Sequence, residues 1–428
     1  MQLTKEVRDK LTKKRWIVLI ASCLINLCIG SLYAWSVFST PMAEYLTQIG
    51  TKTVTAGDLA IIFTVANSVG PVTLISGGFF NDKFGPKWVI FVGGILFGAG
   101  MFLSGMASST GMLLTGYGLG CGLGMGLVYG CTISNSVKFF PDKRGLIGGI
   151  ATASYGISSV LIPPIANALI GKTGVTNAFK IFGVVFLLVV CIGAFFIVQC
   201  PEGFMPTGFE PVLTNPSVPA GGTESVEAKD KNWKQMLADP IFYVMIIMMT
   251  SGAVFGMMTI SQASPIAQNM IGMSVASATI AVSVLALFNA AGRVMAGFVS
   301  DIIGRINTLT VMLVLAVGGL LLLLFSGEGD VLKFYIGISI VGLCFGAFMG
   351  VYPGFTADQF GAKNNSVNYG IMFIGFAAAG YIGPTLVSKV YAADQNYRRA
   401  FLIALGLVVI GLVMSIVYRR LSNRGQRS

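Results

Sequence analysis

The fold is decided by one short motif that occurs twice. Residues 78–87 read GFFNDKFGPK, and residues 297–305 read GFVSDIIGR. Both follow the pattern G-x-x-x-D-x-x-G and end on a basic residue, and they lie 219 positions apart in a chain of 428 residues. A second echo, at an offset of 223, aligns Tyr129 with Tyr352 and Asn135 with Asp358. The sequence therefore predicts two repeated halves.

The composition is that of an integral membrane protein. Hydrophobic residues make up 54% of the chain and charged residues only 11%, whereas a soluble domain carries about a quarter charged residues. This excludes a soluble enzyme, a nucleic-acid binder and a disordered scaffold. The chain has no histidine, so no histidine metal site or histidine proton relay is possible. Its seven cysteines lie in or beside apolar stretches, which argues against a disulfide scaffold.

Apolar windows of about 20 residues predict twelve membrane-spanning helices. The windows are 16–39, 56–80, 88–107, 111–134, 145–170, 178–199, 239–261, 272–300, 306–326, 332–355, 367–391 and 398–418. They are continuous and do not alternate, so spanning strands are excluded. We expect a six-helix half at 1–199, a hydrophilic linker at 200–238 and a second six-helix half at 239–428. Such paired halves are a common transporter architecture.

The basic residues indicate the orientation in the membrane. Of the 28 lysines and arginines, 20 fall on the side of the two termini and the 200–238 linker, and 7 fall on the opposite side. Basic residues concentrate in cytoplasmic segments. We therefore expect a multi-pass protein of the cell (plasma) membrane with both termini and the linker in the cytoplasm. The net charge of +11 is then explained by the basic residues of the cytoplasmic segments, and it does not indicate a nucleic-acid partner.

The repeated loops have the composition of a helix-capping device. Asp82 and Asp301 can accept hydrogen bonds from backbone N–H groups at the start of a neighbouring helix, while Gly85 and Gly304 permit tight turns. Such contacts would form a conformational latch on the cytoplasmic side. Its predicted residues are Gly78, Asp82, Gly85, Lys87, Gly297, Asp301, Gly304 and Arg305. The alternative is that both loops are ordinary polar turns.

Arg293 is the one basic residue inside an apolar window. It lies eight residues before Asp301, about 12 Å inside the cytoplasmic helix end. The 17 acidic residues lie in tails, loops or helix ends, so none sits mid-helix to neutralise it. A charge at that depth requires a partner, and we predict that an anionic substrate supplies it. Asn289, one turn earlier, is the expected hydrogen-bonding companion. The alternative is an arginine that bonds backbone carbonyls or reaches to the membrane surface.

Aromatic side chains on other spans are candidates for the wall of the substrate site. They are Tyr33, Trp35, Tyr129, Tyr155, Tyr352, Phe373 and Phe376. Each could equally serve packing or anchor its helix at the membrane interface. Glycines recur at every second position over 116–126 and at every fourth position over 342–354. On helices such rows allow close packing, a sliding surface, or both.

The repeated loop resembles the signature loop of the major facilitator superfamily, and the resemblance covers all twelve spans. Four further segments resemble its oxalate/formate antiporter family and the related monocarboxylate carriers. These are YAWS at 33–36, the run from Tyr129 to Gly145, Phe288-Asn289 with Arg293, and NYG at 368–370. The resemblance implies that Arg293 corresponds to the family's substrate-binding arginine.

The sequence departs from the family's oxalate exchangers at one position. Those proteins carry a lysine eight residues after the asparagine of Asn-Tyr-Gly, where this chain has Phe376. A single cation suits one carboxylate, while a dianion would leave an uncompensated buried charge. We therefore expect a small monocarboxylate such as lactate, pyruvate or formate, with an oxalate:formate antiporter as the alternative.

The expected mechanism is alternating access, in which the two halves rock about the substrate. A bare cation in the empty carrier favours anion exchange, but proton symport stays open, although no mid-membrane acid or histidine is present. We expect no cofactor, no metal, no catalytic residue and no enzymatic activity, and the protein is expected to be a monomer. A weak-acid channel is a distant alternative. A membrane sensor would need a signalling domain, which the 200–238 linker and short tails do not supply.

Overall fold

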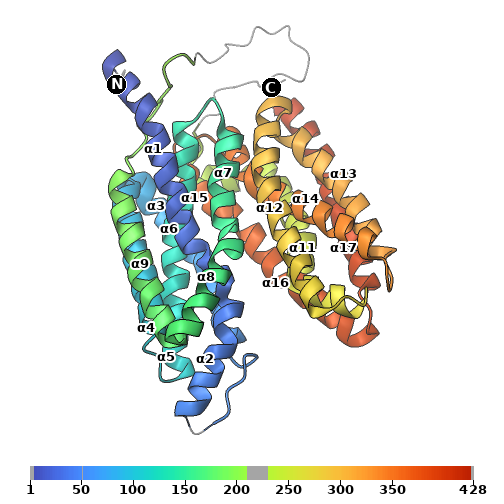
Figure 1. The fold of residues 1–428 in the computed structure, drawn as a ribbon. Helices are drawn as coiled ribbons and strands as arrows, with labels where there is room; N and C mark the ends of the chain where they lie inside the picture. The colour runs from blue at the N-terminus through green and yellow to red at the C-terminus, as the bar shows by residue number, and fades with distance from the viewer. Residues whose placement is uncertain (1–3, 51, 210–229, 426–428) are drawn as a thin grey trace. The chain divides into compact units, whose positions relative to one another are not determined.

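The structure is a computed structural model that describes residues 4–50, 52–209 and 230–425. Within these residues the regular elements are all helical, and twelve helical segments are long and apolar enough to cross a membrane (Figure 1). The predicted all-helical, twelve-span fold is confirmed.

The first six spans include several interrupted helices. They are α1 (Lys5–Ile29), the 3₁₀ segment η1 (Gly30–Ala34) and α2 (Trp35–Ile49); α3 (Ala60–Phe84); α4 (Pro86–Ser104); α5 (Thr110–Leu113), the π-helical segment η2 (Leu114–Cys121) and α6 (Gly122–Phe139); α7 (Arg144–Gly156) and α8 (Ser158–Thr173); and α9 (Val175–Phe196). Pro86 begins α4 because a proline is tolerated at the first helical position, where its missing N–H would have no helical partner.

The last six spans are more continuous. They are α11 (Pro240–Asn269), α12 (Val275–Ile303), α13 (Arg305–Leu324), α14 (Val331–Phe360), α15 (Asn365–Met372) with α16 (Ile374–Asp394), and α17 (Arg398–Gly425). Asp239 caps α11, accepting a hydrogen bond of 2.9 Å from the backbone N–H of Ile241.

The helices differ from the predicted apolar windows mainly at their ends. The first window, 16–39, lies inside a helical segment that runs from Lys5 to Ile49. An apolar window reports only the part that suits the membrane interior, whereas the backbone ladder continues into the polar flanks. Of the predicted linker, residues 210–229 lie outside the described residues, and its second end contains a short helix, α10 (Trp233–Leu237).

The described residues fall into two packing units. Unit 1 comprises the described residues up to Asp142, residues 154–209 and Ala362–Ile371; unit 2 comprises Lys143–Ala153, residues 230–361 and residues 372–425. The units differ from the predicted halves in two places, because Lys143–Ala153 packs with unit 2 and Ala362–Ile371 packs with unit 1. Each exchanged segment contains the first turns of an interrupted span. The boundaries 1–199 and 239–428, which concern the sequence repeat, stay a prediction.

Glycines bring helix backbones together within unit 1. A side chain at Gly122 would collide with the carbonyl of Ala66 on α3, and one at Gly124 with the backbone of Phe97 on α4. This confirms the expected close packing, while the sliding surface stays a prediction. The glycine row does not begin on an α-helix, however, since residues 114–121 are π-helical. Glycines suit that wider turn because they add no side chain where Gly116 and Gly120 approach Gly100 of α4.

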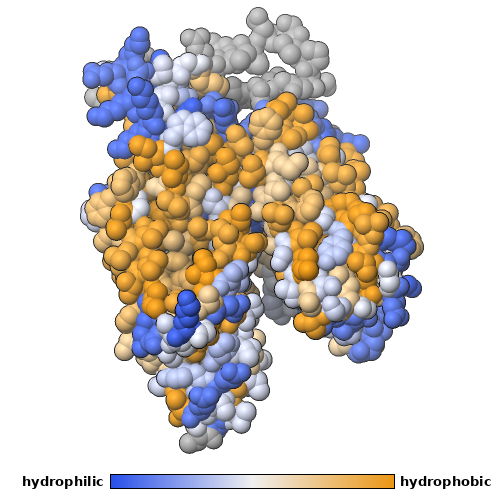
Figure 2. All heavy atoms as spheres, viewed as in Figure 1, coloured by the Kyte–Doolittle hydropathy of each residue, from blue (hydrophilic) through white to orange (hydrophobic). Residues whose placement is uncertain are grey.

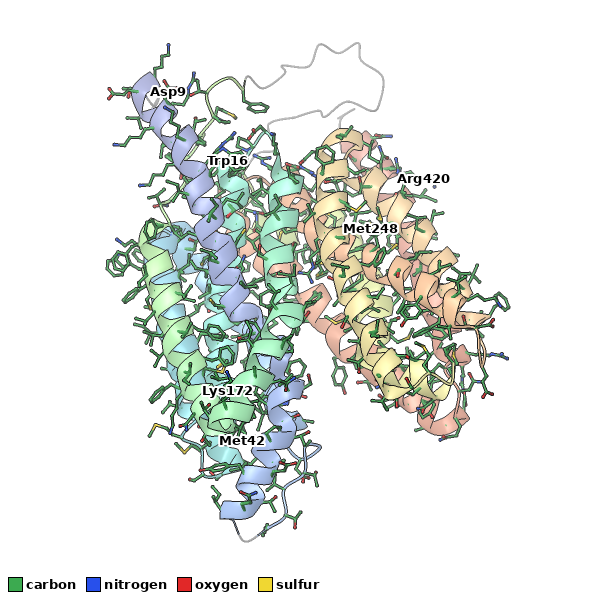
Figure 3. All side chains as sticks on the ribbon, viewed as in Figure 1. Asp9, Trp16, Met42, Lys172, Met248 and Arg420 are labelled. Carbon is green, nitrogen blue, oxygen red and sulfur yellow. The ribbon has the colours of Figure 1, made fainter. Side chains whose placement is uncertain are left out.

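The side chains follow the polarity expected of a membrane protein. Figure 2 shows apolar side chains along the helices and hydrophilic ones at the N-terminal end of α1. Ile192 and Phe195 on α9 are more than half exposed, which is favourable only if lipid covers them. In Figure 3, the charged residues Asp9 and Lys172 lie near helix ends, whereas the buried Met248 lies within α11.

Candidate functional site

Arg293 is buried in unit 2 and its guanidinium is held by two neutral acceptors. It lies on α12 with 4% of its surface exposed. Its Nε donates to Oδ1 of Asn289 at 2.9 Å, and its Nη1 donates to the main-chain carbonyl of Thr152 on α7 at 2.6 Å. The predicted pairing with Asn289 is confirmed. The contact with Thr152 also supports the alternative in which the arginine bonds a backbone carbonyl.

Arg293 has no carboxylate partner in the described part of the chain. The nine ion pairs found there all involve other basic residues. Neutral acceptors solvate a cation but do not cancel its charge. Unit 2 therefore contains a buried positive charge that an anion could neutralise.

Glycines from two helices fix the backbone around Arg293. A methyl group at Gly149 of α7 or at Gly350 of α14 would collide with the main-chain carbonyl of Arg293. A methyl group at Gly346 of α14 would collide with the carbonyl of Asn289. The predicted glycine row on α14 thus packs directly against the turn of α12 that carries the arginine and the asparagine.

The predicted aromatic residues of unit 2 fall into two environments. Phe373, at the break between α15 and α16, packs on Phe376 with ring centres 4.6 Å apart, and Phe376 stacks on Phe345 at 6.2 Å. Tyr352 is fully buried, and its hydroxyl donates to the carbonyl of Met245 at 2.8 Å. The phenylalanines thus form a cluster of stacked rings, whereas Tyr352 is bonded to α11 in the packed interior.

The predicted aromatic residues of unit 1 also divide. Tyr155 contacts both Tyr33 and Tyr129, with ring centres 5.3 and 4.8 Å apart. Trp35 packs instead on Tyr117, whose hydroxyl donates to the carbonyl of Leu32 at 3.1 Å. The structure therefore gathers the three predicted tyrosines into one cluster and places Trp35 in a separate packing contact.

The second repeated loop makes the predicted backbone hydrogen bonds within unit 2. The carboxylate of Asp301 accepts from the N–H groups of Gly145 and Leu146, both at 2.8 Å. These residues lie in the first turn of α7, where N–H groups have no helical partner. Arg305 donates to Asp301 at 2.6 Å, and Gly304 takes the left-handed φ of 89° that glycine favours.

A further acid, Asp358, completes a charge cluster in unit 2. It accepts from Arg144 at 2.7 Å and from Arg305 at 2.8 Å. Together with Asp301, these residues join α7, α12, α13 and α14. The predicted latch did not include Arg144 or Asp358. The alignment of Asp358 with Asn135 was the available signal, since it marked an acid at the end of a glycine-rich helix.

The first repeated loop makes a looser version of these contacts within unit 1. Asp82 accepts from the N–H of Val367 on α15 at 3.3 Å, and a side chain at Gly78 would collide with the backbone of Ser366. The basic partner of Asp82 is Lys138 of α6, at 2.8 Å. The predicted Lys87 lies over the ring of Phe195 instead, 4.4 Å from its centre.

Some of the remaining loop residues behave as expected. Gly85 has a φ of 83° and ends α3 in the predicted tight turn. Lys138 also donates to the carbonyl of Lys363 at 2.8 Å, which ties the end of α6 to the segment before α15. A side chain at Gly297 would collide with the carbonyl of Gly145, so α12 and α7 approach closely beside Asp301.

The sequence comparisons identify the family. A family model described as the Major Facilitator Superfamily matches residues 23–384. The chain belongs to the major facilitator superfamily. It is 30% identical over 365 residues to the uncharacterized MFS-type transporter YhjX of Escherichia coli K12, covering 85% of each chain. It is also 30% identical over 393 residues to the oxalate:formate antiporter of Oxalobacter formigenes, covering 91% of this chain and 88% of that one.

Other similarities are more distant. Monocarboxylate transporter 9 of Rattus norvegicus is 27% identical over 180 residues, which is 42% of this chain and 34% of that one. Among solved structures, the superfamily transporter FucP in the outward conformation matches with a TM-score of 0.69 at 15% identity, covering 95% of this chain and 99% of that one. This likeness concerns the fold alone. As a member of the superfamily, the chain is a multi-pass membrane protein and a secondary transporter.

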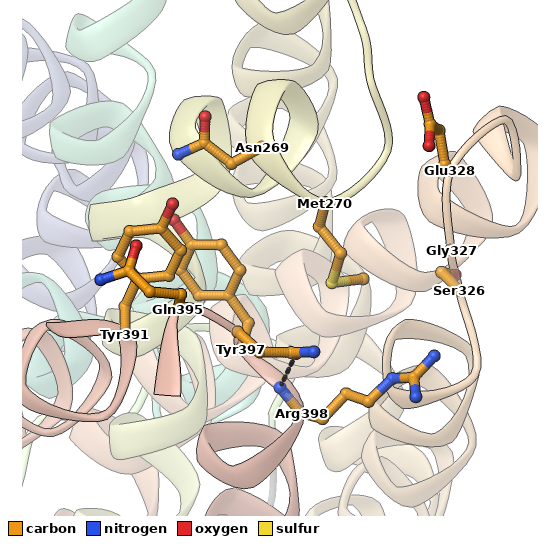
Figure 4. Close-up of a pocket in the computed structure, with 10 residues that line it drawn as sticks. Asn269, Met270, Ser326, Gly327, Glu328, Tyr391, Gln395, Tyr397 and Arg398 are labelled. Carbon is orange, nitrogen blue, oxygen red and sulfur yellow. Dashed lines mark hydrogen bonds between the residues drawn. The ribbon is translucent and has the colours of Figure 1, made fainter. Parts of the chain in front are cut away.

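This superfamily member also has a polar pocket of about 220 Å³ away from the predicted site residues. It lies where α11 ends and α17 begins, and Figure 4 shows Tyr391 and Tyr397 at one side and Glu328 and Arg398 at the other. The two tyrosine rings stack with centres 4.5 Å apart. Burial raises the pKa of the Tyr397 hydroxyl above its ordinary value. None of the predicted substrate or latch residues lines this pocket.

Proposed function

We propose that the protein carries small monocarboxylate anions, of the lactate, pyruvate and formate class, by alternating access, and that Arg293 binds the carboxylate. The observation that carries this proposal is the buried guanidinium without an acidic partner among the described residues. An arginine fork matches a carboxylate in shape and charge. The names of two relatives, an oxalate:formate antiporter and a monocarboxylate transporter, support the same substrate class.

The aromatic residues refine the proposed site. Tyr33, Tyr129 and Tyr155, which cluster in unit 1, and Phe373 and Phe376, which stack in unit 2, are each proposed to contact the substrate. The packing contacts of Trp35 and Tyr352 support a role in shaping their units. The charge cluster around Asp301 and the contacts of Asp82 would act as the conformational latch, because they join helix starts to loops through bonds that can break and form again.

The orientation and assembly are part of the same proposal. We infer that the protein lies in the plasma membrane as a monomer. Both termini would face the cytoplasm, because basic residues concentrate in the segments on that side. It would perform no covalent chemistry. Anion exchange is the proposed mode, since an empty carrier would have to reorient with an uncompensated buried cation.

Phe376 is the residue that would exclude oxalate. Its ring packs between Phe373 and Phe345, so a dianion would meet one cation and an apolar surface. Phe376→Lys should raise oxalate exchange relative to lactate exchange by at least about tenfold, because a second cation compensates the second carboxylate. Phe376→Leu is the matched control and should leave the ratio low. An unchanged ratio in the lysine variant would argue against this position as the selector.

Counterflow in proteoliposomes tests the function. Vesicles are loaded with unlabelled lactate, pyruvate, formate or oxalate, and the uptake of radiolabelled lactate is followed with and without a pH gradient. The proposal predicts saturable uptake that internal monocarboxylate stimulates. Preferred exchange of oxalate would favour the second candidate, an oxalate:formate antiporter. Uptake driven by the pH gradient with no internal anion would show proton symport, and unsaturable flux without counterflow would show a channel.

A further inference from the structure

The guanidinium of Arg293 is bonded to the main chain of a second helix. Its Nη1 donates to the carbonyl oxygen of Thr152 on α7 at 2.6 Å, and both residues are almost fully buried. The side chain of Thr152 takes no part, since its hydroxyl donates to the carbonyl of Gly148 at 2.8 Å. The acceptor is therefore a backbone group whose position is set by the path of α7.

This carbonyl is a weaker partner for the arginine than a carboxylate would be. A carbonyl presents only a partial negative charge, whereas charge-assisted bonds to a carboxylate are roughly twice as strong as neutral ones. Thr152 also lies four residues before the last residue of α7, so helix geometry gives its carbonyl a second donor within the backbone ladder. An arriving anion could thus displace Thr152 without leaving its carbonyl unpaired.

Glycines of α7 bring it close to α12 beside this bond. Gly149 lies against the carbonyl of Arg293, and Gly145 lies against the carbonyl of Gly297 beside the side chains of Ser300 and Arg305. The bond from Arg293 to Thr152 is the side-chain hydrogen bond that joins α7 to this turn of α12. Its loss would leave α7 in close glycine contact with this turn and bonded to α12 through Asp301, two turns further on.

We propose that the Thr152 carbonyl takes the place of the substrate in the empty carrier. It accepts the hydrogen bond from Arg293 there, and the substrate carboxylate displaces it on binding. This inference rests on the proposed function, in which Arg293 binds that carboxylate. The bond from Nη1 to Thr152 breaks and a bond from Nη1 to the anion forms. The empty protein then has a bond between α7 and α12 that the loaded protein lacks, which gives a structural reason for exchange to outpace net transport.

A backbone ester at this carbonyl tests the inference. Replacing Ala153 by its α-hydroxy analogue turns the peptide bond after Thr152 into an ester, whose carbonyl is a poorer acceptor. Lactate should bind about threefold more tightly, because its competitor for the arginine is weakened. The control is the same change at Ile147, which loses a comparable helix bond to Lys143 and does not touch Arg293. It should not tighten binding.

The ester also supplies a direct spectroscopic readout. Its carbonyl stretch lies apart from the amide bands in the infrared, and it should move to higher wavenumber when lactate displaces it from Arg293. A merely structural role of Thr152 would not produce a shift that depends on lactate. If the ester variant does not fold, Gly149→Ala is the second variant. Its methyl group pushes α7 away from Arg293 and should likewise tighten lactate binding, with Gly171→Ala, where space is open, as its control.

The outcomes separate the two proposals. This inference alone would be overturned if the Ala153 ester bound lactate no more tightly than the wild type and its infrared band did not move on adding lactate. The wild-type protein would still bind lactate normally in that case. Wild-type protein that binds none of the monocarboxylates would overturn the proposed function and this inference with it.

Discussion

Arg293 and Asn289 show what the sequence can reveal at the level of single residues. A lone arginine in an apolar window and an asparagine one turn earlier predict a bonded pair, because residues four apart share a helix face. The structure confirms that pair. Thr152 could not be predicted in the same way, since its contribution is a backbone carbonyl that every residue possesses.

Asn289→Asp tests the charge balance around the arginine. A carboxylate one turn away would neutralise Arg293 from within and compete with the substrate. We expect lactate affinity to fall by at least about thirtyfold. Asn289→Ala removes only the neutral acceptor, so its loss should be smaller, about threefold to tenfold. Isothermal titration in detergent measures both, and equal losses in the two variants would contradict a site that depends on net charge.

The glycine row of α14 shows how elements position the site. Gly350→Ala places a methyl group on the carbonyl of Arg293, so α14 and α12 must move apart. We expect a loss of about 1–3 kcal/mol in the free energy of unfolding, seen as a lower melting temperature in detergent. Gly318→Ala on α13 has open space around it and should be neutral or stabilising. A Gly350 variant as stable as this control would refute the packing argument.

The two repeated loops differ in where their basic partner comes from. In unit 2 it is Arg305 of the loop itself, while in unit 1 it is Lys138 of α6. The motif included Lys87 among the latch residues, but it did not name a basic partner for Asp82. A sequence pattern shows which residues are near each other along the chain. The partner of Asp82 lies on α6, which is near the loop in space but not in sequence.

Lys138→Ala and Lys87→Ala form a matched pair that tests this assignment. Lys138 makes a largely buried ion pair with Asp82 and a bond to the carbonyl of Lys363, so its loss leaves Asp82 uncompensated. We expect Lys138→Ala to lower the free energy of unfolding by about 1–3 kcal/mol and to change the exchange rate. Lys87→Ala should alter either quantity little. Both quantities are measured for the two variants, by thermal unfolding and by initial exchange rates in proteoliposomes. A larger effect of Lys87→Ala than of Lys138→Ala would contradict the assignment of Lys138 as the partner of Asp82.

At the scale of the whole molecule, the twelve spans were predictable because the hydropathy of the sequence reports the membrane directly. The division into packing units was less predictable from the sequence. Lys143–Ala153 and Ala362–Ile371 each pack in the unit opposite to their predicted half. An apolar window looks the same whether it is covered by lipid or by either set of helices. The π-helical stretch at 114–121 was also not foreseen, since alternating glycines fit several helix types.

The most direct test of the account is lactate counterflow with Arg293→Gln beside Arg399→Gln. Arg399 is an exposed arginine outside α12, so its variant controls for the loss of a positive charge. The account predicts that Arg293→Gln lowers lactate exchange by at least about thirtyfold at unchanged helix content, because the buried counter-charge of the anion is gone. Arg399→Gln should exchange lactate like the wild type. Saturable lactate exchange that persists in Arg293→Gln would contradict the account.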